Sequence, residues 1–349
     1  MVMLDLLDVL MDREVLAKST TVVLPNITKQ IIGPELITAR TSLQSQTLGI
    51  DAIEFGRLPA GIRTISGEFA LAWNDQALRG TMSGNVLKRV DTIATQVAQQ
   101  IPVQTIDREV VLLARWGHHT WGHWLGQALP LGAMIEARFP GRFVYAVAQE
   151  RGNYGRRVME SLVAYGIGQD RVLQLIPARR WRFERAYIAT SAWTNHAIHP
   201  DALDVMRSTV QATAGKGVSR IAILRRDSVK RGIVNGQEVA DALLDAGFHI
   251  TEMADTPFSD QVSIFREARE LFSILGSGMT GLIYSPDGVR VITVRPEQWK
   301  DSFFYRLAQP RGGEWNELTG PSEPGCPAKD AAFRVDVSLL RTVLAARED

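Results

Sequence analysis

The chain has 349 residues, 45% of them hydrophobic and 22% charged, which is typical of a globular protein with room for two domains. A formal net charge of +1 argues against a nucleic-acid-binding protein, and no apolar run approaches the ~20 residues that cross a bilayer. The single cysteine, Cys326, cannot form an internal disulfide, so we expect a reducing, cytoplasmic compartment.

The N-terminal part of the chain is expected to form an α/β domain over residues 1–195. Asp5 and Asp8 stand where a signal peptide would need positive charge, so no leader is expected. Short apolar segments alternate with turns up to residue 110, and the first clear helical pattern covers Leu87–Gln100.

Strands and helices alternate regularly after residue 110. The spacing predicts strands at Val110–Leu113, Phe143–Ala148 and Val172–Ile176, and helices at Leu125–Ala137 and Gly155–Tyr165. Pro130 should kink the first of these helices or lie in its first turn. Alternation of this kind favours a parallel sheet.

A second α/β domain is expected over residues 196–349, after a polar candidate linker at Ser191–Pro200. Its predicted strands are Ile221–Leu224, Phe248–Met253, Leu271–Leu275 and Val289–Val294. Its predicted helices are Gly236–Ala246, Ser259–Glu270 and Val337–Ala346, and the last is also compatible with packing back on the first domain. Gly312–Lys329 is rich in Gly and Pro and is expected to be a surface loop.

A glycine-rich turn follows the predicted strand that ends at Leu275. It contains Gly276, Ser277, Gly278 and Thr280 and leads into a short apolar segment. Glycines let a backbone approach a ligand closely, and a following helix offers free N–H groups to an anion such as a diphosphate. A plain chain reversal is the alternative interpretation.

Basic residues follow the predicted strand Ile221–Leu224, beginning with Arg225 and Arg226. Ligands of open α/β sheets bind beyond the carboxyl ends of strands, where arginine can grip phosphate oxygens. Arg225 and Arg231 are therefore candidate phosphate-binding residues, with a solvated basic loop as the alternative. Asn235 and Glu238 have the spacing of a capping box, which is the structural alternative to ligand contact.

A second candidate cluster lies in Arg115–Leu125, which reads RWGHHTWGHWL. It contains His118, His119, His123, Trp116, Trp121 and Trp124. Indoles stack on sugars, and an imidazole accepts a proton near neutral pH, so this segment suits sugar binding and general-base chemistry. A packed aromatic loop without chemistry is the alternative. Gly117 and Gly122 argue against a regular helix, and no carboxylate completes a metal site.

No Asp-x-Asp pattern occurs in the chain. Enzymes that hold a nucleotide diphosphate through a divalent metal commonly use that pattern. Its absence favours metal-free stabilisation of a leaving diphosphate by arginine and helix N-termini. We therefore expect neither a metal nor another cofactor.

Three blocks of the chain resemble glycosyltransferase family 61 (DUF563), over about residues 115–297. The matching stretches are Gly122-His123-Trp124-Leu125 with Leu129-Pro130, then Ile223-Leu224-Arg225 with Arg231, Asn235 and Glu238, and finally Gly276–Thr280 with Tyr284–Gly288. Two positions depart from the family pattern, because Leu275 replaces a usual histidine and Gly281 a usual asparagine.

The resemblance implies a GT-B-like fold, in which two Rossmann-like domains face each other across a cleft. It implies that the C-terminal domain holds a nucleotide sugar, that the N-terminal domain holds the acceptor, and that transfer inverts the anomeric centre. His123 is the candidate base, with His118 and His119 as nearest substitutes. The donor-binding candidates are Arg225, Arg231, Asn235, Glu238, Gly276, Ser277, Gly278 and Thr280, and the acceptor-binding candidates are Trp116, Trp121 and Trp124.

The first functional hypothesis is therefore a metal-independent inverting glycosyltransferase of bacterial capsular or surface polysaccharide synthesis. It would move a sugar, with UDP the favoured carrier, to a glycan or lipid-linked glycan, in the cytoplasm and at the inner face of the membrane. An inactive nucleotide-sugar or glycan-binding protein is the second hypothesis, and a dinucleotide enzyme is the third. The sequence leaves the donor sugar, acceptor, linkage and oligomeric state open.

Overall fold

The computed structural model of this mixed α/β protein describes residues 3–24, 46–74, 76–81, 103–195, 197–215, 217–224, 231–299, 301–323, 325 and 330–346. Its contacts divide the chain into two compact units. Unit 1 comprises Met1–Thr20, Gly49–Thr194 and Ile198–Gln211, and unit 2 comprises Thr21–Leu48, Asn195–Ala197 and Ala212–Asp349. Within the described residues, no helix combines the length and the apolar character that crossing a membrane requires.

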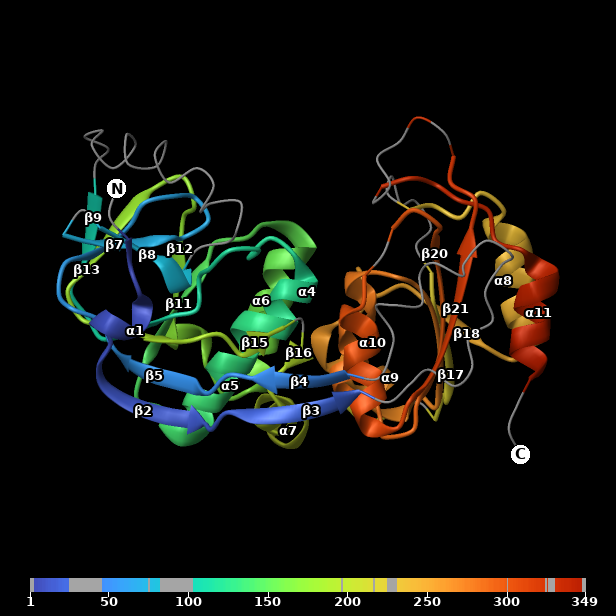
Figure 1. Ribbon diagram of the computed structural model, residues 1–349, viewed down its shortest axis with the longest axis horizontal. Coiled ribbons are helices and arrows are strands. Elements are labelled where there is room, and N and C mark those ends of the chain that lie inside the picture. Colours follow the sequence, from blue (N-terminus) through green and yellow to red (C-terminus); the bar gives the residue numbers. More distant parts are fainter. Residues whose placement is uncertain are drawn as a thin grey trace. The chain divides into compact units, whose positions relative to one another are not determined.

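Unit 1 is built on a six-stranded sheet with the order β12-β11-β10-β14-β5-β2 (Figure 1). Its strands are β2 (Met11–Ala17), β5 (Ile53–Arg57), β10 (Val110–Leu112), β11 (Val144–Ala148), β12 (Val172–Leu175) and β14 (Ala186–Ala189). β12, β11, β10 and β14 run parallel, whereas β5 pairs antiparallel with both β14 and β2. The apolar runs of β10 and β11 are those expected of strands covered on both faces.

A second six-stranded sheet of unit 1 has the order β1-β8-β7-β6-β13-β9. Its strands are β1 (Met3–Leu4), β6 (Ile62–Thr64), β7 (Leu71–Trp73), β8 (Gln76–Leu78), β9 (Val103–Ile106) and β13 (Arg180–Phe183). Leu71, Trp181 and Phe183 of this sheet share one buried cluster with Val110 and Leu112 of β10. The main core of unit 1 therefore lies between its two large sheets.

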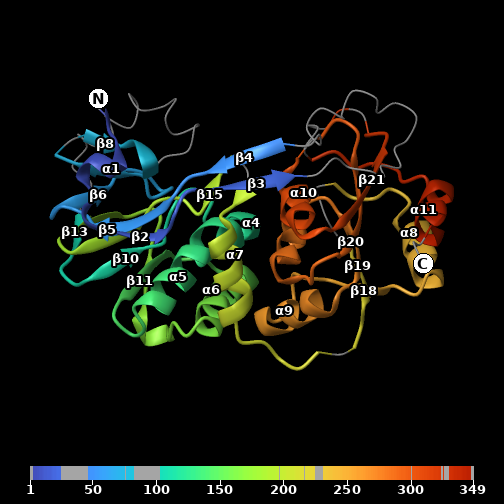
Figure 2. The same ribbon diagram turned by 60° about the horizontal axis from the view of Figure 1, so that its bottom comes forward.

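Helices cover the other face of the parallel strands in unit 1. They include α4 (Trp121–His123), the π-helix η3 (Trp124–Ala128), α5 (Leu129–Arg138), α6 (Gly152–Ala164) and α7 (Pro200–Thr209), with α1 (Leu6–Val9), η2 (Arg79–Thr81) and η4 (Gln169–Arg171) elsewhere. Figure 2 shows α5, α6 and α7 close together along that face. A Cβ at Gly132 of α5 would lie 2.9 Å from the Leu113 side chain, so glycine allows α5 this close approach to the sheet.

Unit 2 is a five-stranded sheet, parallel throughout, with the order β18-β17-β19-β20-β21. Its strands are β17 (Arg220–Ile223), β18 (His249–Thr251), β19 (Glu270–Ile274), β20 (Arg290–Pro296) and β21 (Glu314–Gly320). Every residue of β20 is buried, as expected for a strand inside a parallel sheet with both faces covered.

Helices lie on both faces of the sheet in unit 2. They are α8 (Gly236–Asp245), α9 (Phe258–Glu267), η5 (Ser277–Tyr284), α10 (Phe303–Ala308), η6 (Gln309–Arg311) and α11 (Val337–Ala345). α8 and α11 lie side by side on one face, and α9 and α10 lie on the other (Figure 1). Val239 and Leu243 of α8 share a buried cluster with Leu340 and Leu344 of α11, so α11 belongs to the core of unit 2.

Three local predictions need comment. Gly312–Lys329 is not a surface loop throughout, because β21 occupies its first part and pairs with β20 along its length. Ser191–Pro200 is not irregular, because β15 (Trp193–Thr194) pairs there with β16 (Ala197–Ile198). The helix expected at Leu87–Gln100 lies outside the described residues. A further two-stranded sheet joins β3 (Thr20–Leu24) to β4 (Gln46–Ile50).

Candidate functional site

The strand order of unit 1 marks one edge of its parallel sheet as the natural place for a ligand. β10 lies between β11, which follows it in the chain, and β14, which comes last, so the direction of strand addition reverses beside β10. Ligands of α/β sheets bind beyond the carboxyl ends of the strands at such a reversal. The segments that leave this edge begin at Leu113, Gln149 and Thr190, after β10, β11 and β14 respectively.

His118 and Glu150 come from two of these segments and meet at this edge. The His118 Nδ1 atom lies 2.5 Å from a carboxylate oxygen of Glu150, and both side chains are mostly buried. No other hydrogen bond engages the His118 ring within the described residues, so its Nε2 atom has no protein partner among them. A carboxylate bound at Nδ1 orients an imidazole so that Nε2 can accept a proton.

Neighbouring side chains hold His118 in place. The Tyr154 hydroxyl donates a hydrogen bond to the His118 carbonyl oxygen, and burial together with the charge of Glu150 raises the pKa of Tyr154. Phe69 packs edge-on against the His118 ring, with 5.3 Å between ring centroids. Phe69 itself has a φ of 57°, which is strained for an aromatic residue, and strain of this kind concentrates at functional sites.

His123 is packed between two indoles. Its ring lies 4.4 Å from that of Trp116 and stacks on Trp193 at 5.6 Å, measured between centroids. Gly117 makes this packing possible, because it has a φ of +78° and a Cβ there would lie 2.7 Å from the His123 ring. The expectation that glycines exclude a helix here is wrong for Gly122, which lies within α4, and right for Gly117.

The protonation of His123 is set by its surroundings. Burial lowers its pKa below the ordinary value, the Gln127 amide opposes the shift, and the nearby His119 lowers it further. The Nδ1 atom of His123 is buried and has no hydrogen-bond partner. The ring is therefore neutral near neutral pH. It directly precedes the π-turn η3, and such turns are frequent at functional sites.

The other aromatic candidates differ in exposure. Trp116 and Trp121 are partly exposed, and Trp121 packs edge-on against Tyr154. Trp124 is buried, and its indole donates a 2.8 Å hydrogen bond to Ser161 of α6, which makes it a core residue. His119 is exposed, and its ring lies at the edge of His118.

Pro130 lies in the first turn of α5, which is one of the two positions predicted for it.

The equivalent edge of unit 2 carries the glycine-rich turn. The order β18-β17-β19-β20-β21 reverses beside β17, so the segments that leave β17 and β19 flank the expected ligand position. A Cβ at Gly278 would lie 3.5 Å from the Ile223 side chain, which puts the turn directly beside the end of β17. Arg225 follows that strand end but lies outside the described residues.

Buried residues in and beside the Gly276–Thr280 turn pack against the core of unit 2. Thr280 is fully buried, and its hydroxyl oxygen has no hydrogen-bond partner among the described residues. Leu275 is fully buried as well, so the position that replaces a histidine of the resembling family points into the core. A Cβ at Gly281 would lie 2.0 Å from Phe265 of α9, which explains why this chain cannot carry asparagine there without repacking.

The remaining donor-binding candidates have mostly structural contacts. Asn235 begins α8, but its side chain does not cap the helix. Its amide instead donates to the Val335 carbonyl at 2.9 Å and accepts from the Val335 N–H at 3.0 Å. Glu238 is exposed and lies 3.9 Å from Arg334. The Arg231 guanidinium lies 4.4 Å from the centroid of Trp299, a cation–π contact at the strand-end side of unit 2.

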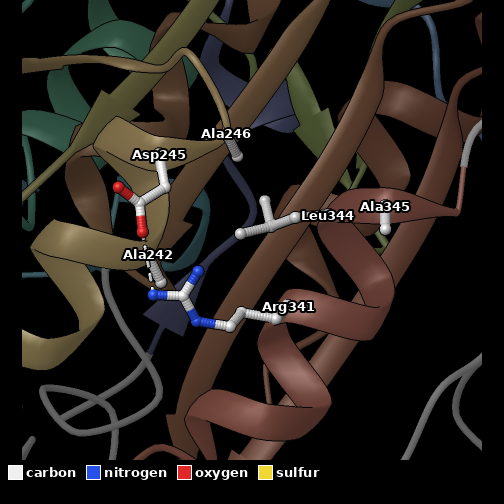
Figure 3. A pocket seen from close by; sticks show the side chains of 6 residues that line it. All are labelled: Ala242, Asp245, Ala246, Arg341, Leu344 and Ala345. Atoms are coloured by element: carbon white, nitrogen blue, oxygen red, sulfur yellow. Dashed lines mark hydrogen bonds and ion pairs between the residues drawn. The ribbon is translucent and has the colours of Figure 1, made fainter.

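A hollow of about 460 Å³ lies elsewhere in unit 2, between α8 and α11 (Figure 3). Its lining residues are Ala242, Asp245, Ala246, Arg341, Leu344 and Ala345. Asp245 and Arg341 form an exposed ion pair at 2.9 Å across it. This hollow is near the carboxyl end of α8 and contains none of the predicted site residues. No group of three or more potential metal ligands is found in the described part of the chain.

These strand-end sites fall partly within a stretch that is similar to a known family. Residues 121–292 match the family described as Glycosyltransferase 61. The match includes His123, Glu150 and the turn at Gly276, and it begins after Arg115 and His118. A comparison with curated proteins gave no match.

Several residues of these sites were not among the predicted ones, and three of them follow strand ends. Glu150 and Trp193 follow strands β11 and β14, and Trp299 follows β20. Each stands a few residues beyond a predicted or observed strand end, and that position is the signal that could have identified them. Their partners are distant in sequence, so only the strand order brings them to His118, His123 and Arg231.

Proposed function

We propose that the protein is an inverting, metal-independent glycosyltransferase that moves a sugar from a nucleotide sugar to a glycan acceptor. The observation that carries this proposal is the His118–Glu150 pair, which stands at the strand-end edge of unit 1 beside a stack of aromatic rings. The similarity of residues 121–292 to Glycosyltransferase 61 gives the reaction class. The proposal includes a GT-B-like arrangement, with one Rossmann-like domain for each substrate.

The reaction needs a base and a stabilised leaving group. An acceptor hydroxyl oxygen attacks the anomeric carbon, the bond from that carbon to the donor's diphosphate breaks, and the hydroxyl proton moves to the base. In this proposal Nε2 of His118 receives the proton, and Glu150 stabilises the imidazolium that forms. Arg225 and the N–H groups of the Gly276–Thr280 turn would stabilise the departing diphosphate, which is UDP in the favoured case.

His118 is preferred to His123 as the base on geometric grounds. His118 has an orienting carboxylate, and its Nε2 atom has no hydrogen-bond partner among the described residues, so the ring is arranged as a general base would be. His123 lies between Trp116 and Trp193 with Nδ1 buried, so it suits a wall of the sugar site. His123 was the first choice from sequence, and its substitution is the matched comparison for His118.

Acceptor recognition is assigned to aromatic rings of unit 1. Trp116 and Trp121 are partly exposed and available for sugar stacking, and Trp193 joins them through His123. Trp124 would act only by packing α4 against α6. The acceptor class we propose is a glycan or lipid-linked glycan of surface polysaccharide synthesis, used in the cytoplasm at the membrane surface.

An inactive nucleotide-sugar-binding protein is the second candidate, favoured by Leu275 in place of a histidine. The test is to incubate the protein with a panel of UDP-sugars and measure free UDP, with and without added oligosaccharides. The proposal predicts free UDP from at least one donor, increased by an acceptor. Binding of UDP-sugars with no release of UDP under any condition would support the inactive binder.

A further inference from the structure

Arg115 is a largely buried cation with few partners among the described residues. It follows β10 at the strand-end edge of unit 1, and its Nε atom is buried without an acceptor. Its Nη2 atom donates a long, 3.3 Å hydrogen bond to the carbonyl oxygen of Ala189, at the end of β14. No carboxylate contacts its guanidinium within the described residues. Among the described residues, most of the five N–H donors of this group therefore have no protein acceptor.

Three other shielded arginines of this chain are paired with carboxylates. Arg171 lies 2.8 Å from Glu136, Arg220 lies 3.0 Å from Glu270, and Arg295 lies 2.7 Å from Glu317. Burial lowers the pKa of Arg115 to about 10, with no carboxylate to offset it. A buried charge without a partner is costly, so a chain that keeps one commonly uses it to bind the opposite charge.

The surroundings of Arg115 indicate what carries that opposite charge. The next residue, Trp116, packs edge-on against His123, and His123 stacks on Trp193. This aromatic stack suits the face of a sugar ring. Arg115 also contacts the end of β14, which neighbours β10 where the strand order of unit 1 reverses. An anion bound here would therefore lie next to a bound sugar.

We propose that unit 1 binds an acidic sugar, whose carboxylate or phosphate pairs with the Arg115 guanidinium while its ring packs on the aromatic stack. A planar guanidinium can hold either anion through two parallel hydrogen bonds. The inference rests on the proposed function only in naming this sugar as the acceptor. The two sources of the anion, a uronic acid and a sugar phosphate, are separated by the experiment.

The experiment is a ligand-observed NMR titration of the full chain with D-glucuronate, glucose 1-phosphate, methyl glucoside and UDP. Wild type is compared with Arg115→Met, Arg115→Lys and the control Arg138→Met. Arg138 ends α5 in the same unit, is 63% exposed, and pairs with Glu14. We expect Arg115→Met to weaken binding of at least one acidic sugar roughly tenfold or more, as loss of a charge-assisted contact does. The affinity of Arg115→Lys for that sugar should lie between those of wild type and Arg115→Met, and the affinity of Arg138→Met should equal that of wild type.

The two acidic probes distinguish the two possible sources of the anion. A response to glucuronate identifies a uronic acid, and a response to glucose 1-phosphate alone identifies a phosphate. Equal affinity of wild type and Arg115→Met for both acidic sugars overturns the proposal, and so does a loss confined to UDP, which would assign Arg115 to the donor. The titration measures binding and needs no turnover, so it tests the acidic-sugar site whether or not the protein transfers a sugar.

Thermal unfolding supplies a second readout on the same variants. If Arg115 serves a ligand, Arg115→Met without ligand should melt at or above the wild-type temperature, because an unpaired buried charge is removed. If Arg115 only links β10 to β14 through Ala189, the melting temperature of the variant should be clearly below that of wild type. Its affinity for all four probes should then fall by the same factor. That second result overturns the proposal.

Discussion

At the scale of single residues, the proposed proton transfer depends on the contact between His118 and Glu150. In this proposal the carboxylate fixes which ring nitrogen faces the substrate and stabilises the charged ring after proton transfer. Glu150 would then be a positioning residue, and His118 would be the group that touches the reacting hydroxyl. The two roles leave different kinetic signatures.

Glu150→Gln should lower kcat and leave the KM for the donor nearly unchanged. The amide can still fill the space beside His118, but it cannot stabilise an imidazolium, so part of the roughly 10²–10⁴-fold gain from a positioned base is lost. Glu150→Asp should recover some turnover because the charge is kept. Steady-state kinetics of both variants provide the check. Equal kcat values for wild type and Glu150→Gln would remove Glu150 from the catalytic arrangement.

Arg225→Ala should weaken UDP binding without changing the melting temperature. Arg225 follows β17, beside which the Gly276–Thr280 turn is placed by the contact of Gly278 with Ile223. A charge-assisted bidentate contact contributes about 1.5–3 kcal/mol. Isothermal titration calorimetry with UDP measures the loss, and Arg207→Ala of α7 is a control in the other unit. An unchanged dissociation constant for UDP would exclude the assignment.

At the scale of elements, α5 is tied to the parallel strands of unit 1 by Glu136. Its carboxylate accepts two hydrogen bonds from Arg171, one from the Tyr145 hydroxyl and one from the Gly141 N–H. Burial alone would raise the pKa of Glu136, but these hydrogen bonds outweigh burial and lower it. The charged form is thus favoured by folding, and its contribution is present above the carboxylate's ordinary pKa. It is lost as the pH falls through the lowered value.

Glu136→Gln should destabilise the protein at neutral pH and matter less in acid. Near pH 7 the loss should be roughly 1–3 kcal/mol, because Arg171 keeps its charge in a mostly shielded place. Below pH 4.5 the difference should shrink because the unfolded wild-type chain then binds the proton, and it should vanish once the pH falls below the lowered pKa of Glu136 in the folded chain. Urea unfolding at several pH values measures this trend. Asp107→Asn, in an exposed pair with Arg185, is the control and should change little. A difference that is constant from pH 7 to pH 3 would contradict the linkage.

The elements also show what could be predicted from sequence. Strands β10, β11, β19 and β20 were predictable because buried parallel strands are nearly continuous apolar runs. β21 was not, since its buried Asn316 and Glu317 look like loop residues until Arg295 and the Val291 carbonyl are seen to satisfy them. The turn at Gly276 was recognisable from local spacing. The pairing of His118 with Glu150 was not, because it depends on the order of strands in the sheet.

At the scale of the whole molecule, the proposed mechanism places proton transfer in unit 1 and stabilisation of the leaving group in unit 2. Neither step is assigned to a metal ion. Transfer should therefore continue in excess EDTA, at a rate within about twofold of the untreated enzyme. The measurement is UDP release before and after chelation, with added Mg²⁺ or Mn²⁺ as the second arm. Loss of activity with EDTA and its recovery with either ion would show the metal-free mechanism to be wrong.

The division of labour can be tested most directly on His118→Ala, with His123→Ala as the matched comparison. On each variant we would measure turnover on a donor that wild type consumes and the dissociation constant for UDP. We predict that His118→Ala loses roughly 10²–10⁴-fold in turnover while its UDP affinity and melting temperature stay close to wild type. We predict a smaller loss for His123→Ala, expressed mainly in the KM for the acceptor. Wild-type turnover in His118→Ala, or the larger loss of kcat in His123→Ala, would contradict the assignment of His118 as the base.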